Sequence, residues 1–344
     1  MNGVVPDADA PLLVVEDLTK HYPVRGGVWG RTLGSVQAVA GVSFTVHKGQ
    51  TLGLVGESGC GKSTLGRTLM RLEEPTSGRV SFEGRDLAHA SPAELFGLRR
   101  DLQMVFQDPY SSLNPRLTAG EIVREPLLVH GMGSKAEQNE RVRGLFETVG
   151  LSAEMMARYP GEFSGGQRQR IGVARALALG PKLVIADEPV SALDVSVQSQ
   201  VLNLMVRLQR ELGLTYIFIS HDLSVVEHVS DSVAIMYLGR IVEQGPVRTI
   251  FDQPVHPYTQ ALIRAIPLPD PRRRRQAVPL QGETPSPMAP PPGCPFSSRC
   301  AFAIDACRQA VPPLLPVGDG TQASHRVACI RAETTAAAWA ADTA

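Results

Sequence analysis

Three absences narrow the class of protein. No apolar run approaches the roughly 18 to 20 residues that a bilayer-crossing helix needs, so any work at a membrane requires partner subunits. The 34 basic residues balance 34 acidic ones, and this lack of net charge disfavours a DNA or RNA partner. The first residues, MNGVVPDADAPLL, lack the basic segment and apolar stretch of a secretory signal, which favours a cytoplasmic location.

Cysteine is also scarce, and its distribution is uneven. The sequence has five cysteines, of which only Cys60 precedes residue 290. The other four are Cys294, Cys300, Cys307 and Cys329. In a reducing compartment this arrangement suggests a metal or cluster site before it suggests disulfides.

The distribution of apolar residues predicts an α/β fold. Short β-prone runs occupy 12–55, and helical periodicity dominates from Ser91 to about Leu179. The runs KLVIAD and TYIFIS are apolar on both faces, as expected of central parallel strands, and an amphipathic helix separates them. After His256 proline and arginine become frequent, so a linker or irregular extension begins near residue 265.

A phosphate-binding loop is predicted at 56–63, where GESGCGKS satisfies G-x-x-x-x-G-K-[ST] between an apolar strand and a helix. Glycines there let backbone N–H groups turn toward phosphate oxygens, Lys62 reaches the terminal phosphates, and the Ser63 hydroxyl ligates magnesium. The alternative is a chance glycine-rich loop, which the flanking strand and helix disfavour. The residues expected to contact the nucleotide here are Gly56, Glu57, Ser58, Gly59, Cys60, Gly61, Lys62, Ser63 and Thr64.

Two carboxylates end a later apolar strand, in LVIADEP, where ligands of open α/β sheets gather. Asp187 suits magnesium, usually through a water molecule, and Glu188 suits the base that polarises the attacking water. The structural alternative is a carboxylate pair that only caps the next turn. Taken alone, the pair does not separate these two interpretations.

The segment FSGGQRQR, at 163–170, lies between the phosphate loop and this carboxylate pair. Its serine hydroxyl, glycine amides and helix start form an anion site on physical grounds, although an ordinary serine-capped helix has the same pattern. Its core resembles the signature motif of the ATP-binding-cassette (ABC) family, which caps the γ-phosphate of a nucleotide held by the opposite subunit. The residues of this core are Ser164, Gly165, Gly166 and Gln167.

Further positions match that family in the same order. Gln107 resembles the Q-loop residue that senses magnesium, water and the membrane partner, Asp194 in SALD resembles the D-loop, and His221 resembles the switch histidine at the γ-phosphate. Tyr22 is the candidate for stacking on adenine, with a core or surface role as the alternative. The resemblance implies Glu188, His221 and Gln107 as catalytic residues, and Ser63, Gln107 and Asp187 as the magnesium site.

The resemblance also implies the fold and its boundaries. We expect a P-loop NTPase of the ABC type, with a RecA-like core, an antiparallel β subdomain, an inserted helical subdomain and an irregular C-terminal extension that carries the cysteines. The expected boundaries are 12–262 for the cassette, about 108–178 for the helical subdomain, 263–335 for the extension and 336–344 for a disordered tail. Since the signature serves the other subunit, two cassettes would sandwich two ATP molecules head to tail.

The runs FQDPYSSLNPR, DEPVSALDVSVQSQVLNL and HPYTQAL closely resemble ATP-binding subunits of dipeptide and oligopeptide importers, in particular the F-type subunit. This branch implies ATP-driven peptide import, with the chain peripheral on the cytoplasmic face of the cell membrane. The implied partners are two transmembrane permeases, a second ATPase subunit in a heterodimer and, indirectly, an extracytoplasmic solute-binding protein, without nucleic acid. The implied cofactors are ATP and Mg²⁺. The segment with the four late cysteines resembles a region that binds a [4Fe–4S] cluster in some members of the family, with Zn²⁺ or unligated thiols as alternatives.

Three rival functions stay open. A soluble ABC ATPase acting on nucleic acid or ribosomes is disfavoured, because Lys62 and Ser164 lie too close in sequence for the long coiled coil of chromosome-maintenance relatives. A cassette that binds ATP without hydrolysing it is disfavoured by the intact Glu188 and His221. An importer of another solute, such as nickel or haem, is an alternative because the cargo is chosen by other subunits.

Overall fold

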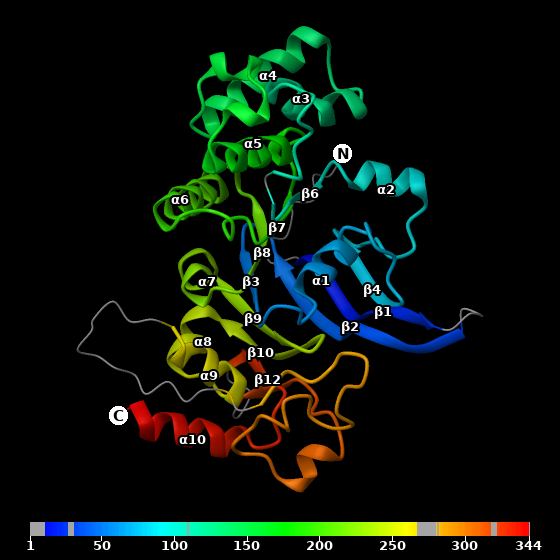
Figure 1. Cartoon of the computed structure of the whole chain (residues 1–344), viewed down its shortest axis with the longest axis vertical. Coiled ribbons are helices and arrows are strands. Elements are labelled where there is room, and N and C mark those ends of the chain that lie inside the picture. Colours follow the sequence, from blue (N-terminus) through cyan, green and yellow to red (C-terminus); the bar gives the residue numbers. More distant parts are fainter. Residues whose placement is uncertain are drawn as a thin grey trace, which may run out of the picture. The chain divides into compact units, whose positions relative to one another are not determined.

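The computed structural model describes residues 11–26, 31–108, 110–266, 280, 282–317 and 322–343. The chain divides into two compact units, whose elements Figure 1 labels. The first consists of Met1–Leu12, Val46–Thr51 and His89–Ile219, and the second of Leu13–Thr45, Leu52–Ala88 and Ser220–Ala344. Within the described ranges, no helix has the length and apolar character needed to cross a membrane.

Parallel strands form the core of the first unit. They are β6 (Leu102–Val105), β7 (Leu183–Asp187) and β8 (Thr215–Ser220), in the order β6-β7-β8. The register pairs Asp187 with Ile219, and every residue of β7 and β8 is buried. Strands that are buried on both faces need apolar side chains on both, which explains the continuous runs in the sequence.

Helices make up most of the rest of the first unit. They are α2 (Pro92–Leu98), α3 (Ala119–Val129), α4 (Lys135–Thr148), α5 (Gly165–Leu177) and α6 (Val195–Leu212), with 3₁₀ turns at Ala153–Ala157 and Pro160–Glu162. Four of them begin with a capping box, in which a Ser or Thr and the Glu or Gln three residues later satisfy each other's backbone N–H groups. The helices α3, α4 and α5, green in Figure 1, pack on one another and fall inside the predicted helical segment.

The second unit contains two sets of strands. One sheet has the order β2-β1-β4-β5 and comprises β1 (Pro11–Gly26), β2 (Arg31–His47), β4 (Ser77–Phe82) and β5 (Arg85–Asp86), with antiparallel β1–β4 and β4–β5 pairs. The other set runs β11-β12-β10-β9-β3 and comprises β3 (Thr51–Val55), β9 (Ser232–Tyr237), β10 (Arg240–Pro246), β11 (Leu315–Val317) and β12 (Gln322–Val327). Only β3 and β9 pair in parallel within this set, since the later strands add antiparallel.

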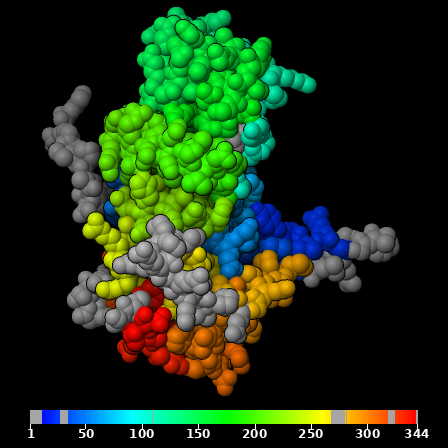
Figure 2. All heavy atoms as spheres, turned by 60° about the vertical axis from the view of Figure 1, so that its left-hand side comes forward, coloured from blue at the N-terminus to red at the C-terminus, as the bar shows by residue number. Residues whose placement is uncertain are grey.

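The remaining helices of the second unit flank these strands. They are α1 (Lys62–Leu69), α7 (Leu223–Val229), α8 (Val247–Asp252), α9 (Pro257–Arg264) and α10 (Ala332–Thr343), with a 3₁₀ turn at Asp305–Arg308. Between α9 and α10 the described residues from 280 onward form the C-terminal extension, which is mostly irregular as predicted. In Figure 2 the orange residues of this extension lie against the red residues of α10.

The end of the chain differs from the prediction of a disordered tail at 336–344, because these residues continue α10 as far as Thr343. Trp339 explains the difference, since the residue is 6% exposed and its Nε1 donates to the Asp252 carbonyl oxygen at 3.2 Å. Arg264 lies 5.0 Å from the centre of the same ring and pairs with Asp342 at 2.5 Å. A single aromatic residue in an Ala/Thr-rich segment therefore anchors the helix.

A buried carboxylate joins three parts of the second unit. Glu243 of β10 is 0% exposed, and its Oε1 lies 2.9 Å from Nε2 of His325 in β12. It also accepts the backbone N–H groups of Val255 and His256 at 2.7 and 2.9 Å, just before α9. Because a buried carboxylate needs partners, this network fixes the extension's last strand to the strand and helix that precede it.

Candidate functional site

The phosphate loop lies between β3 and α1 in the second unit. Lys62 is only 4% exposed, and its Nζ donates to the carbonyl oxygens of Gly56 and Glu57 at 2.7 and 3.0 Å. Gly61 caps α1 with a φ of 105°, and a Cβ there would lie 1.9 Å from the Ala38 carbonyl oxygen. This position needs glycine for both its left-handed backbone and its close approach to β2.

The other residues of the loop occupy the predicted strand-to-helix turn. Ser58 and Gly59 are exposed at its tip, while Ser63 and Thr64 begin α1 and are half-buried. Cys60 is buried, and burial raises the pKa of its thiol despite the nearby Lys62. Cys60 therefore acts as a small packing residue, since the reactive form of a cysteine is the thiolate.

The two carboxylates after β7 lie in the first unit and differ in exposure. Asp187 is 1% exposed at the last position of the strand, whereas Glu188 is half-buried and has a left-handed φ of 44°. The Glu188 N–H donates to the Ile219 carbonyl oxygen at 3.0 Å, and Gln107 Nε2 donates to Glu188 Oε2 at 3.0 Å. A non-glycine residue in this backbone region is strained, which is typical of functional positions.

The structure brings Gln107 and Glu188 together, two residues for which the sequence predicts separate roles at magnesium and water. Gln107 follows β6 and Glu188 follows β7, so both side chains come from the C-terminal ends of adjacent parallel strands. This edge of an open α/β sheet is where ligands bind. An amide beside a carboxylate can orient a water molecule between a proton acceptor and a hydrogen-bond donor.

The predicted signature forms the start of α5, also in the first unit. Ser164 is exposed, its Oγ accepts the Gln167 N–H at 3.3 Å, and its own N–H donates to Gln167 Oε1 at 3.0 Å. A Cβ at Gly166 would lie 2.3 Å from Val197 Cγ1 of α6, while Gly165 faces Leu193. The helix start is therefore packed closely against the segment that contains the D-loop.

The structure leaves the other predicted contacts as predictions. Asp194 is the N-cap residue of α6, without a side-chain capping bond. His221 is exposed in the turn between β8 and α7, and it belongs to the segment Ser220–Ala344 of the second unit. The Tyr22 hydroxyl donates to Glu73, and Lys20 Nζ lies 4.9 Å from the centre of the Tyr22 ring, so the cation covers part of the surface that would stack on adenine.

Two family models match the chain, and they follow each other in sequence. The model described as ABC transporter covers residues 39–191, which include the phosphate loop, signature and carboxylate pair. The model described as Oligopeptide/dipeptide transporter, C-terminal region, covers 242–307.

Curated relatives match almost the whole chain. A probable peptide ABC transporter ATP-binding protein of Sinorhizobium fredii is 59% identical over 95% of this chain and 92% of its own length. The oligopeptide transport ATP-binding protein AppF of Bacillus subtilis is 52% identical over 92% of this chain and 96% of its own. This chain belongs to the peptide branch of the ABC transporter ATP-binding proteins.

Further comparisons agree with this family, including its F-type subunits. The dipeptide transport ATP-binding protein DppF of Escherichia coli is 54% identical over 90% of this chain and 92% of its own. A dimeric ATP-binding cassette solved in a post-hydrolysis state with ADP and Pi has a TM-score of 0.61 at 29% identity. The match covers 69% of this chain and 99% of that one. A part of an ABC transporter complex from Clostridium perfringens has the same TM-score over 71% of this chain and 91% of that one. The ABC ATP-binding protein described here is accordingly an ATPase with the predicted P-loop α/β fold.

The cysteines of this ABC protein converge without forming a metal-binding group. All four late cysteines line one small cavity of the second unit, together with Phe296 and Phe302. Burial, with a smaller contribution from neighbouring thiols, raises the pKa of Cys294 to about 11, and burial also raises the pKa of Cys300 and of Cys329. None of the five cysteines is in a disulfide, and no three His, Cys, Asp or Glu side chains of the described residues are grouped to hold a metal ion.

Sequence reasoning missed three residues that contact the phosphate loop. Tyr258, Thr284 and Arg299 all hydrogen-bond to Glu57, and all lie more than two hundred positions later in the chain. No local spacing signals such contacts. The sequence singled out the HPYTQAL run only for its resemblance to peptide importers, and in the structure its Tyr258 follows the proline that begins α9.

Proposed function

We propose that this ABC ATPase powers the import of peptides across the cytoplasmic membrane, from a peripheral position on its cytoplasmic face. The observation that carries the proposal is the match of residues 242–307 to the oligopeptide/dipeptide transporter C-terminal region, later in the same chain than the ABC transporter match at 39–191. Relatives that match at least 90% of this chain are named as peptide, dipeptide and oligopeptide transport proteins, which supports the same cargo class. The proposed partners are two permeases, a second ATPase subunit in a heterodimer and an extracytoplasmic solute-binding protein.

In the proposed reaction the phosphate loop binds the β- and γ-phosphates of ATP through its backbone N–H groups and Lys62. Glu188 accepts a proton from a water molecule whose oxygen attacks the γ-phosphorus, and the bond to the bridging oxygen of ADP breaks. Gln107, which donates to Glu188 Oε2 at 3.0 Å, orients that carboxylate, and His221 contacts the γ-phosphate. Ser164 and the two glycine amides after it cap the nucleotide of the partner subunit, with Asp194 beside that contact.

Magnesium fits the oxygen donors that the proposal assigns to it. Ser63, Asp187 and Gln107 offer a hydroxyl, a carboxylate and an amide oxygen, which suit a hard cation. Asp187 is 1% exposed at a strand end, where a nearby cation would compensate the charge of its carboxylate. When bound, Mg²⁺ neutralises charge on the β- and γ-phosphate oxygens.

A [4Fe–4S] cluster in the C-terminal extension is part of the proposal, with Zn²⁺ as its alternative. Four thiols around one cavity are a suitable donor set for either group. In the described arrangement no three of these thiols are grouped as metal ligands, and burial raises the pKa of Cys294. The support for either group is therefore the number and chemical type of the donor atoms. Iron, acid-labile sulfide and zinc should be quantified in protein purified without oxygen, and the absence of all three would refute this part.

Membrane co-purification of the tagged chain tests the transport function. We expect mass spectrometry to find two permeases and a second ATPase, and we expect the purified complex to hydrolyse ATP faster when binding protein and peptide are added. Recovery of ribosomes or nucleic acid without any permease would refute the transport proposal. That result would leave the family assignment and the ATPase activity unchanged.

A further inference from the structure

Glu57 of the phosphate loop is held by an arginine from the C-terminal extension. Arg299 Nη1 lies 2.9 Å from Glu57 Oε2, and Arg299 Nη2 lies 3.1 Å from Glu57 Oε1, so the ion pair is bidentate. The Thr284 hydroxyl also donates to Glu57 Oε2 at 2.9 Å. The Arg299 side chain is 7% exposed and that of Glu57 26%, which shields the pair from solvent.

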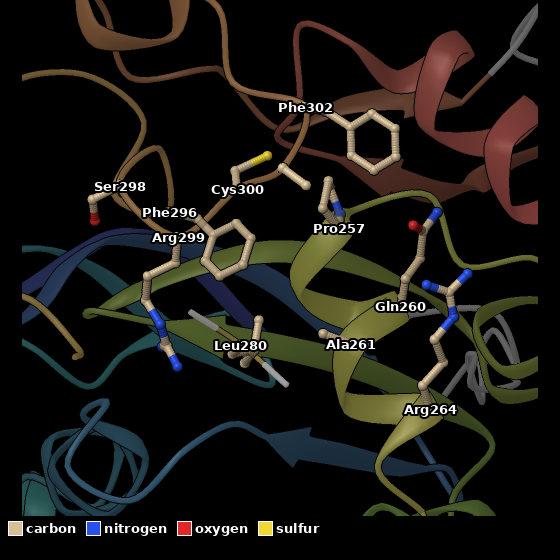
Figure 3. Close-up of a pocket in the computed structure, with 11 residues that line it drawn as sticks. Pro257, Gln260, Ala261, Arg264, Leu280, Phe296, Ser298, Arg299, Cys300 and Phe302 are labelled. Atoms are coloured by element: carbon tan, nitrogen blue, oxygen red, sulfur yellow. The ribbon is translucent and has the colours of Figure 1, made fainter. Parts of the chain in front are cut away.

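Aromatic rings hold Arg299 in this position. Its Nη1 lies 3.4 Å from the Tyr237 hydroxyl, and Tyr237 contacts Phe296 edge-on with ring centres 5.3 Å apart. Phe296 also lies 5.5 Å from the ring of Tyr258 in α9. Figure 3 shows Phe296 and Arg299 on one segment of the extension, with Pro257 at the start of α9 on the opposite side of the cavity.

Pairing with Glu57 stabilises the charge on Arg299. Burial alone would lower the pKa of this guanidinium, but the hydrogen bonds to Glu57 and to Tyr237 outweigh burial and raise the pKa. An arginine that is buried to this extent would be costly without its carboxylate. The pairing therefore favours one position of the Glu57 side chain strongly.

The backbone of Glu57 is held at both of its polar groups. Its N–H donates to the Tyr258 hydroxyl at 2.8 Å, and its carbonyl oxygen accepts from Lys62 Nζ at 3.0 Å. Lys62 is the residue that reaches the terminal phosphates in a loop of this type. A displacement of Glu57 consequently changes the hydrogen bonds of Lys62 and the direction of the loop's N–H groups.

We propose that Arg299 is a positioning residue for ATP binding, and that the C-terminal extension is thereby part of the nucleotide site. Arg299 does not touch the nucleotide in this proposal. It holds Glu57, and through Glu57 it holds Lys62 and the phosphate loop in the conformation that receives the phosphates. The proposal rests on the ATPase activity of the family and is independent of the cargo.

Substitutions in the purified full-length chain test this role. In Arg299→Ala we expect the dissociation constant and the KM for MgATP to rise about tenfold, and kcat to change less than about twofold. Arg299→Lys, which keeps the charge but loses the bidentate fork, should restore part of the affinity. Glu57→Ala combined with Arg299→Ala should be no worse than Arg299→Ala alone, because both remove one contact.

A matched control is Arg308→Ala in the same extension. The Arg308 side chain is 67% exposed and pairs with the exposed carboxylate of Asp305 at 3.5 Å. We expect its affinity for MgATP to equal that of the unchanged chain, as measured by isothermal titration calorimetry. An Arg299→Ala protein that unfolds at lower temperature but binds MgATP with unchanged affinity would overturn the proposal. In that case the contact would only attach the extension.

A second variant keeps the test decisive if Arg299→Ala does not fold. Tyr258→Phe removes only the hydroxyl that accepts the Glu57 N–H and keeps the ring that packs on Phe296. We expect a rise of about threefold in the dissociation constant for MgATP, with kcat retained. Unchanged affinity in Tyr258→Phe would contradict the idea that the position of Glu57 controls ATP binding.

Discussion

The phosphate loop and the carboxylate after β7 are positioned by different parts of the chain. Glu57 is held by Thr284 and Arg299, which follow it by 227 and 242 positions. Glu188 is held inside the first unit, by Gln107 and by its backbone bond to Ile219. If the proposed roles hold, the extension contributes to the affinity of the phosphate loop for ATP, whereas contacts within the first unit position the group that cleaves it.

The largest expected effect separates turnover from binding at Glu188. In Glu188→Gln we expect kcat to fall on the order of 10²- to 10⁴-fold, because the amide cannot accept the proton of the attacking water. The affinity for MgATP should change little, since Gln107 can still donate to the new amide oxygen. Steady-state ATPase assays and calorimetry measure the two quantities.

The matched control for this substitution is Glu140→Gln on α4, where the carboxylate is 73% exposed. Its kcat should equal that of the unchanged protein. Turnover that survives Glu188→Gln would mean that another group is the base, and would remove the basis for assigning catalysis to the first unit.

A smaller effect is expected at the signature. In Gly166→Ala the new Cβ would lie 2.3 Å from Val197 Cγ1, so we expect a loss of about 1 to 3 kcal/mol in the free energy of unfolding and a lower kcat. Val197→Ala in the same chain should restore much of both, because it removes the clashing methyl group. Urea unfolding and ATPase assays provide the measurements.

Gly172→Ala in the same helix is the control, since a Cβ there meets nothing within 4 Å. We expect it to be neutral or to stabilise by up to about 1 kcal/mol, as alanine favours helix. If Gly166→Ala behaves like Gly172→Ala, the close contact between α5 and α6 does not position the signature.

The effect that is smallest near neutral pH concerns the buried histidine at the start of α9, and it grows as pH falls. Burial lowers the pKa of His256 from 6.5 to about 3, and its Nδ1 accepts the Tyr258 N–H at 3.1 Å. Between these values the unfolded chain binds a proton that the folded chain does not. Stability should therefore fall as pH decreases from 6.5 toward 3, by about 1.4 kcal/mol per pH unit for this group.

His256→Asn isolates this contribution, because asparagine does not titrate and its side-chain oxygen can still cap α9. We expect a shallower loss of stability below pH 6.5 than in the unchanged protein, measured by urea unfolding at several pH values. Parallel curves for the two proteins would show that the buried imidazole does not contribute to the acid sensitivity of the second unit.

Short sequence motifs indicate where the parts of the candidate site lie in the fold, while the roles of these residues stay predictions. The places of the phosphate loop and of the carboxylate pair at strand ends were predictable because each depends on one short segment. The Gln107–Glu188 contact joins residues 81 positions apart and was not predicted. The capping boxes can also be recognised in the sequence, since a Ser or Thr followed three residues later by Glu or Gln begins four helices of the first unit. Local chemistry determines these features.

Features that depend on distant contacts were not predictable in the same way. The sequence pattern indicated a role for Cys300 but none for its neighbour Arg299, although Arg299 makes the contact with the phosphate loop. The α10 helix was missed because Ala and Thr dominate its sequence and its stabilising contacts, from Trp339 to α8 and α9, join segments far apart. Neither contact leaves a periodic pattern in the sequence.

The distance between Glu57 and Arg299 has a consequence for the timing of biosynthesis. Arg299 is added 242 residues after Glu57, which corresponds to roughly 10 to 50 seconds at a ribosomal rate of about 5 to 20 residues per second. Throughout that interval the nascent chain already has its glycine-rich loop and Lys62, but not the arginine that holds Glu57. On the proposed role of Arg299, the newly made protein would acquire its full affinity for ATP only after this residue has been added, when residues 89–219 have already been synthesised.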